Sequence, residues 1–220
     1  NTLSSQSMNI QVVDTTGVAS YQFEQIGTMY AKAPANPDYH KLINITGRTA
    51  TGVSVQLVYA ANGLPEGIQN ITSSNAAFDP TVVSGGRRYL KVDYTGTASS
   101  VSTTLKAWSA GGAEVASITV TASATAQYMQ NVYFKETTKT MSIAGGVDHN
   151  FSTFLEAKDQ YGVDFSLAGV DVYYMTTNSA VISVDNATGT FKLIAAGTCT
   201  LKAYYPATDR TLEMVVNVTN

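Results

Sequence analysis

The chain has 220 residues, a length that fits one large domain or two domains of about 100 residues each. Apolar residues make up 44% of the sequence and charged residues 13%, about half the usual share, so hydroxyl and amide groups dominate its polar surface. The net charge of -3, without clustered Lys and Arg, argues against nucleic acid or anionic lipid as a partner. No apolar run is long enough to predict a membrane-spanning helix.

The first half of the chain alternates between strand-like runs and turn residues. Pro34 and Pro37 predict a loop over residues 31–40, because proline has no N–H to donate to a strand ladder. Asn62-Gly63 and Gly111-Gly112 favour turns, since asparagine and glycine accept positive φ. Alternating apolar and polar residues predict the strands between these turns. They lie at residues 8–13, 20–26, 42–45, 53–59, 68–76, 89–94, 101–107 and 115–121.

A domain boundary is predicted within residues 121–128, which are small and polar and carry no periodic signal. The predicted domains are residues 1–124 and residues 128–220. Residues 1–18 have no counterpart in the second domain. They are either an extra edge strand or the tail of a preceding domain.

The second domain repeats the pattern of the first. Its predicted strands lie at residues 139–143, 151–157, 170–174, 181–184, 191–193, 199–203 and 212–218. We align Lys139–Gly145 with Lys41–Gly47, because both runs show the strand pattern and end on glycine. Cys199, the only cysteine, is in phase with Leu201 and Ala203, which predicts a small buried apolar residue.

One tetrapeptide occurs in both halves. Thr200-Leu201-Lys202-Ala203 repeats Thr104-Leu105-Lys106-Ala107, 96 positions later. Repetition of this kind is typical of a chain built from copies of one unit. With about seven short strands in each copy, the sequence predicts an all-β protein made of two tandem β-sandwiches.

The second domain resembles a bacterial immunoglobulin-like (Ig-like) domain. The residues that carry the resemblance follow the order of that family: the turn Asp159-Gln160-Tyr161-Gly162, the run from Asn178 to Asp185, the pair Thr188-Gly189, and the run from Ala196 to Ala203. The first domain matches less closely, because Asn62-Gly63 replaces the first turn and about five residues are inserted near residues 97–101.

The resemblance implies an Ig-like fold and a secreted protein of the bacterial cell surface. Such domains occur in tandem in surface-layer (S-layer) proteins and in adhesins, and a composition rich in Thr, Ser, Ala and Val resembles the S-layer group more. A subunit of that kind would have neighbouring subunits and the adjoining domains of its parent chain as partners. We therefore expect a self-assembling structural protein of the cell wall. The alternative is an adhesin stalk or a carbohydrate-binding module.

Catalytic motifs are absent from the sequence, which predicts that the protein is not an enzyme. Calcium is the one candidate ligand, since it takes six to eight oxygen ligands and loops at the ends of a sandwich can supply them. The candidate calcium residues are Asp159, Asp164, Asp171 and Asp185. The alternative is that these acids cap the backbone of their own turns.

Trp108 and Tyr204 are candidates for a contact surface. Each is in phase with the lysine of its repeat, Lys106 or Lys202, so both are predicted on the outer face of their strands. Exposed aromatic rings commonly contact proteins or sugars. The alternative for Trp108 is that it folds over the end of its sandwich. In a carbohydrate-binding module these two rings would stack on sugars, whereas in a lattice they would contact a neighbouring subunit.

Overall fold

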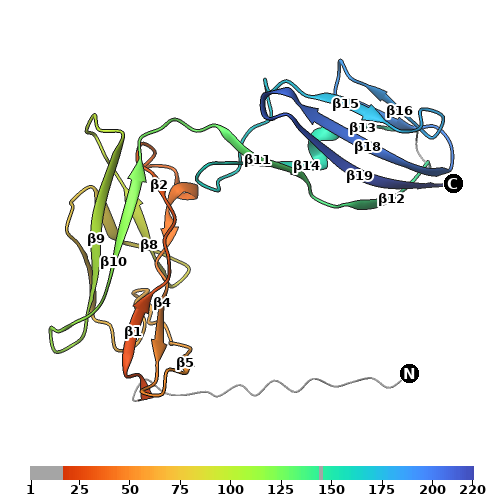
Figure 1. The fold of residues 1–220 in the computed structure, drawn as a ribbon. Coiled ribbons are helices and arrows are strands. Elements are labelled where there is room, and N and C mark those ends of the chain that lie inside the picture. Colours follow the sequence, from red (N-terminus) through yellow and green to blue (C-terminus); the bar gives the residue numbers. More distant parts are fainter. Residues whose placement is uncertain (1–16, 144–145) are drawn as a thin grey trace, which may run out of the picture. The chain divides into compact units, whose positions relative to one another are not determined.

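The computed structural model describes residues 17–143 and 146–220 (Figure 1). The chain divides into two compact units, Asn1–Ala126 and Gln127–Asn220, called unit 1 and unit 2 below. Both are built from strands, so the predicted all-β class with two Ig-like β-sandwiches is confirmed. Within the described ranges no helix could span a membrane. The strand predicted at residues 8–13 lies outside the described residues.

Unit 1 contains three sheets, with strand orders β1-β4-β5, β2-β10-β9-β6 and β3-β8-β7. Its elements are β1 (Ser20–Phe23), β2 (Met29–Tyr30), the 3-10 helix η2 (Pro37–Tyr39), β3 (Lys41–Leu42), β4 (Ile45–Arg48), β5 (Ser54–Val55), β6 (Asn70–Ser73), β7 (Phe78–Ser84), β8 (Arg87–Val92), β9 (Ser100–Trp108) and β10 (Glu114–Ser123). The inner faces of these sheets enclose one apolar core, with Met29, Leu90 and Leu105 fully buried.

Unit 2 contains sheets with strand orders β11-β14, β12-β19-β18-β15 and β13-β17-β16. Its elements are β11 (Met129–Phe134), β12 (Thr138–Ser142), β13 (Asp148–Asn150), η3 (Phe151–Thr153), β14 (Leu155–Asp159), β15 (Tyr173–Thr176), β16 (Ile182–Asp185), β17 (Thr190–Leu193), β18 (Gly197–Tyr205), η4 (Pro206–Thr208) and β19 (Arg210–Thr219). A second apolar core lies between them, with Phe151, Leu201 and Val216 fully buried.

The four-stranded sheets of the two units have the same plan. In each, a long antiparallel pair occupies the centre, β9 with β10 and β18 with β19. A short strand runs parallel to the last strand of the pair, β2 beside β10 and β12 beside β19. The opposite edge is β6 in unit 1 and β15 in unit 2. The two copies predicted from the sequence therefore share a strand arrangement as well as a tetrapeptide.

The repeated tetrapeptide occupies the same place in both sheets. Its Leu and Ala are fully buried in each copy, as Leu105 and Ala107 and as Leu201 and Ala203. Its Thr and Lys point to the other face, because successive side chains of a strand alternate. Burial of a leucine side chain contributes about 1.5–3 kcal/mol. The prediction for Cys199 is confirmed, since this free cysteine is 4% exposed in the core of unit 2.

The proposed alignment of Lys139–Gly145 with Lys41–Gly47 is wrong. Lys139 lies in β12, which pairs with β19, and its structural counterpart in unit 1 is β2. Lys41 lies in β3, which pairs with β8. The two runs look alike because any short alternating run does, whereas the pairing partner that distinguishes them lies far away in the sequence.

Other strand predictions also needed correction, and β11 and β13 were not predicted. Only Ser54–Val55 of the strand predicted at residues 53–59 is a strand. In the strand predicted at residues 151–157, the first residues form η3, which the Asn150 side chain caps by accepting from the Ser152 N–H at 2.9 Å. Strand β7 (Phe78–Ser84) was not predicted, and it contains Pro80. The ladder there has a bulge between Asp79 and Val82, which is where a sheet tolerates proline.

Tyr205 provides a test of the unit 2 core. Its side chain is fully buried, and its hydroxyl has no hydrogen-bond partner among the described residues. An unpaired buried hydroxyl is unfavourable, so Tyr205→Phe should raise the free energy of unfolding by about 1 kcal/mol. Urea unfolding followed by circular dichroism would measure this change.

Tyr59→Phe is the matched control in unit 1. The Tyr59 hydroxyl donates to the Ile45 carbonyl at 3.2 Å and accepts from the Ile45 N–H at 3.3 Å, so this variant should lose about 1 kcal/mol. Fluorescence of Trp108, the only tryptophan, reports on unit 1 separately. A loss of 1 kcal/mol or more in Tyr205→Phe would contradict the description of the unit 2 core.

Candidate functional site

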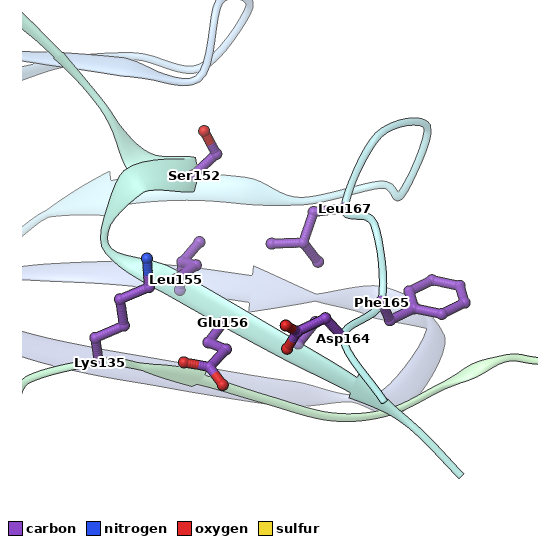
Figure 2. A pocket seen from close by; sticks show the side chains of 8 residues that line it. Lys135, Ser152, Leu155, Glu156, Asp164, Phe165 and Leu167 are labelled. Atoms are coloured by element: carbon purple, nitrogen blue, oxygen red, sulfur yellow. The ribbon is translucent and has the colours of Figure 1, made fainter. Parts of the chain in front are cut away.

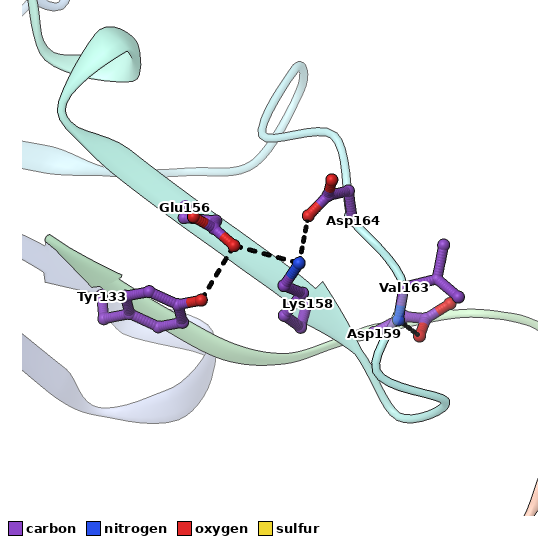
Figure 3. Close-up of polar contacts among 6 residues, drawn as sticks. All are labelled: Tyr133, Glu156, Lys158, Asp159, Val163 and Asp164. Atoms are coloured by element: carbon purple, nitrogen blue, oxygen red, sulfur yellow. Dashed lines mark hydrogen bonds and ion pairs between the residues drawn. The ribbon is translucent and has the colours of Figure 1, made fainter. Parts of the chain in front are cut away.

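The turn Asp159-Gln160-Tyr161-Gly162, one of the runs that carry the resemblance, closes the loop after β14 (Figure 3). The Asp159 side chain is 1% exposed, and its Oδ1 accepts from the N–H groups of Tyr161 at 2.8 Å and Val163 at 2.9 Å. Gln160 Oε1 accepts from the Tyr128 N–H at 2.9 Å, and the Tyr161 side chain is buried. Gly162 has φ +81°, which favours glycine. Each residue of the motif therefore has a structural task.

The later motif residues also shape turns. Asn178 Oδ1 accepts from the Ala180 N–H at 3.1 Å, and Asp185 Oδ1 accepts from the Ala187 N–H at 2.9 Å. Hydrogen bonds from the Thr188 side chain and from the Ala187 N–H lower the pKa of the Asp185 carboxyl. At Gly197 a Cβ atom would lie 2.9 Å from Val181 Cγ2, so a larger residue would displace the core. The residues that carry the resemblance thus stabilise turns and core packing.

The four candidate calcium residues lie in different settings. Asp159 and Asp185 cap turns, as described above. Asp164 forms an ion pair with Lys158 at 2.5 Å, and Asp171 is exposed. Among residues 17–143 and 146–220 no group of three or more Asp, Glu, His or Cys side chains is placed to hold a metal ion. Calcium binding at these residues stays a prediction.

A polar network covers the outer face of β11 and β14 (Figure 3). The Tyr133 hydroxyl donates to Glu156 Oε1 at 2.9 Å, and Lys158 Nζ lies 3.0 Å from the same oxygen and 2.5 Å from Asp164 Oδ1. Hydrogen bonds from Lys158 and then from Tyr133 lower the pKa of the Glu156 carboxyl. Bonds to Asp164 and then to Glu156 raise the pKa of the Lys158 ammonium. At neutral pH the network is a set of satisfied ion pairs that ties the loop carrying Asp164 to β14.

An open recess of about 350 Å³ lies beside this network (Figure 2). Its apolar part includes Leu155 and Leu167, and Leu167 points toward Leu155 in the view shown. Lys135, at its edge, donates to the Thr153 carbonyl at 2.9 Å. Glu156 and Asp164 also line it, and Lys158 forms an ion pair with each carboxylate. The recess therefore offers a small apolar surface beside charges that are already paired.

The structure places Trp108 and Tyr204 at equivalent positions, near the ends of β9 and β18. Trp108 pairs with Asn70 of β6 and Glu114 of β10. Tyr204 pairs with Tyr173 of β15 and Thr211 of β19. Both side chains are half-buried and lie on the face of the sheet that points away from the core.

The surroundings of the two rings differ. The Trp108 Nε1–H donates to Thr72 Oγ1 at 2.9 Å, and Lys106 Nζ lies 5.9 Å from the ring centroid. An open recess of about 510 Å³ beside the indole has a mostly polar, uncharged lining of Gln69, Asn70, Thr72, Ser109, Ala110 and Gly112. The Tyr204 ring instead lies 6.4 Å from that of Tyr173, centroid to centroid, and its hydroxyl donates to Asp209 Oδ1 at 3.2 Å.

The repeated lysine has an acidic partner in both units, which the sequence analysis missed. Lys106 pairs with Glu114 at 2.7 Å, and Lys202 pairs with Glu213 at 2.6 Å. Each glutamate lies on the strand that follows the repeat, so a Lys in the repeat and a Glu in the next alternating run were the available signal. The outer face of each four-stranded sheet therefore carries an aromatic ring beside a Lys–Glu pair.

Comparison with known proteins gave matches only among solved structures. No family model and no curated protein matches the chain. Domains 6-7 of the surface-layer protein SbsC are 17% identical, with 92% of this chain and 100% of that chain covered and a TM-score of 0.33. Domains 4 and 5 of SbsC are 12% identical over 92% and 99%, with a TM-score of 0.34. The D00-D0 domain of intimin is 11% identical over 91% and 100%, with a TM-score of 0.32.

Asp159 allows a test of the motif's structural task. In Asp159→Ala the N–H groups of Tyr161 and Val163 lose their buried acceptor, so unit 2 should lose about 1–3 kcal/mol of unfolding free energy in urea. Asp159→Asn keeps an oxygen at the Oδ1 position and should retain most of the stability. If Asp159→Ala were as stable as the unmodified chain, the turn would not depend on this cap.

Proposed function

We propose that the chain is a structural part of a secreted bacterial surface layer, in which its two β-sandwich units associate laterally with further copies. The observation that carries this proposal is the outer face common to the two four-stranded sheets. Both copies of the tetrapeptide present a lysine paired with a glutamate, next to an aromatic side chain. Assemblies with symmetry use the same contact many times, and a face that occurs twice in one chain suits that use.

The character of this surface also supports lateral association. Only 13% of the residues are charged, and threonine and serine supply much of the polar surface. Protein interfaces are depleted in charged residues at their centres and enriched in Tyr, Trp and Met. Hydroxyl groups can exchange hydrogen bonds with water for bonds across an interface. A surface of this composition therefore favours many modest contacts.

The turns support a mechanical role. The motifs that resemble bacterial Ig-like domains are used for caps, positive-φ glycines and close packing, as at Asp159, Gly162 and Gly197. These contacts fix loops of unit 2. We infer that unit 2 acts as a stiff building block rather than as a catalytic domain.

An adhesin stalk or carbohydrate-binding module is the second candidate, and the recess beside Trp108 favours it. The indole is held by its bond to Thr72, and the adjacent Gln69 and Asn70 carry amide groups. A planar ring flanked by uncharged donors and acceptors suits a sugar, which has apolar faces and hydroxyl edges. In this role the two units would remain monomeric and bind a glycan.

Calcium is a further part of the proposal. Asp159, Asp164, Asp171 and Asp185 are the candidate ligands, and their loops lie outside the sheets or at their ends. Weak binding there would stiffen the loops of unit 2 and strengthen the array. Asp164 would have to exchange its bond to Lys158 for a bond to the ion.

Concentration dependence tests the proposed function. The 220-residue chain would be studied by sedimentation velocity over a hundredfold concentration range, with and without millimolar calcium, and by negative-stain electron microscopy at the highest concentration. The proposal predicts a sedimentation coefficient that rises with concentration, and ordered sheets or rows on the grid. Monomers at all concentrations in both conditions would contradict it, and a positive glycan-binding screen would then favour the carbohydrate-binding candidate.

A further inference from the structure

The outer face of β15, β18 and β19 in unit 2 carries a cluster of exposed apolar side chains. Tyr173 is 53% exposed, Met175 43% and Val215 37%, and the half-buried Tyr204 lies beside Tyr173. We call these four residues, together with Lys202 and Glu213, the tyrosine face. The neighbouring residues of the same strands point the other way, and Leu201, Ala203, Met214 and Val216 are buried in the core. The tyrosine face therefore belongs to a well-anchored sheet.

Strand register arranges the tyrosine face in rows. Tyr173, Tyr204 and Thr211 form one row, and Met175, Lys202 and Glu213 form the next. Thr200 and Val215 are paired in the row after that. The only charged side chains in these three rows are Lys202 and Glu213, which lie side by side at the centre and pair with each other. The face is thus apolar and aromatic, with one dipole across two adjacent strands.

The edge strands of the two four-stranded sheets differ in their outward side chains. The positions equivalent to Tyr173 and Met175 are Asn70 and Thr72 on the edge strand β6, opposite Trp108 and Lys106. The Lys–Glu pair is present in both units, whereas the large apolar side chains on the edge strand occur only in unit 2. The fold accepts polar residues at these two positions, so it does not require the exposed apolar ones. An exposed apolar cluster that the fold does not require indicates an interaction surface.

The central charges indicate which partner fits. Consider a twofold axis that runs along the strands, between β18 and β19, with two sheets face to face. It places β18 of each copy over β19 of the other, so Lys202 of one copy faces Glu213 of the other. The same operation places Tyr204 over Thr211 and Val215 over Thr200. A twofold axis perpendicular to the strands would instead bring Lys202 onto Lys202. The face is therefore self-complementary in one orientation.

We propose that the tyrosine face of unit 2 pairs with the same face of a second copy of this chain. The two copies pack sheet to sheet, about 10 Å apart, as stacked sheets do inside a β-sandwich. Because the strand order is β12-β19-β18-β15, β15 of each copy lies over the β12 edge of the other, where Tyr173 and Met175 lose exposure to water. Val215 is covered by Thr200 of the other copy, and the two Lys–Glu pairs together form one group of four alternating charges. This inference rests on the proposed function, because it assigns one contact of the lateral association to particular residues.

The first test replaces the edge-strand residues by their unit 1 counterparts. In the full 220-residue chain, Tyr173→Asn with Met175→Thr should raise the dissociation constant of the dimer at least tenfold in sedimentation velocity, since tyrosine and methionine anchors carry much of an interface. Val58→Thr with Val83→Thr is the control, because these valines are 69% and 45% exposed but lie in unit 1. The control should leave the dissociation constant unchanged.

The second test uses the charges. Lys202→Glu leaves two acidic groups on each face, and Glu213→Lys leaves two basic groups, so each variant alone should dimerise at least tenfold more weakly. An equimolar mixture of the two variants should dimerise again, because every acid then faces a base. Rescue by mixing requires that the two tyrosine faces meet each other, because an acidic face then meets a basic one. Circular dichroism would show that both variants are folded.

The outcomes separate this inference from the proposed function. If the unmodified chain associates but the edge-strand and charge variants associate equally well, the tyrosine face is not the contact, and lateral assembly through another surface stands. If the charge variants are weakened and mixing does not rescue them, the face meets a different surface and the twofold pairing is wrong. If the unmodified chain is monomeric at every concentration, both the pairing and the lateral assembly are overturned.

Discussion

The antiparallel pairing of two long strands in each unit is the constraint on which the rest of the structure depends. β9 with β10 and β18 with β19 are the longest ladders, and each buries a Leu and an Ala of the repeat on one side. Because side chains alternate along a strand, burial of these residues turns the Thr and Lys of the repeat outward. Core packing and surface chemistry are therefore set by the same four residues.

Because burial of Leu and Ala turns Thr and Lys outward, repetition of the tetrapeptide also repeats the side chains on the outer face of the sheet. The lysine that the core forces outward meets a glutamate on the next strand, and the aromatic residue two positions further lies beside it. The ion pairs are half-exposed, and pairs of that kind add little to stability. These pairs place a positive and a negative charge side by side on the outer face, and a partner of complementary charge can recognise them. Unit 2 adds large apolar residues to this pattern and unit 1 adds a polar recess, so the two copies have diverged around a common plan.

The sequence predicted the parts of the fold that depend on long local patterns. Strands β9, β10, β18 and β19 were found because alternation persists along most of their length, and the same phase placed Trp108 and Tyr204 outward. Two-residue strands such as β2 and β3 exist only through their distant partners, so no local pattern could distinguish them, and Lys139 was aligned with the wrong strand. The cluster of Tyr173, Met175 and Val215 depends on register across three strands, which the sequence of a single strand does not contain.

Native-state amide hydrogen exchange tests the central claim most directly, because the slowest amides mark the most stable part of each unit. The account predicts that the slowest amides in both units lie in the four long strands, with Leu105 and Val120 in unit 1 and Leu201 and Met214 in unit 2 among them. Slowest exchange in β7 and β8 or in β11 and β14, with rapid exchange in the long pairs, would contradict it.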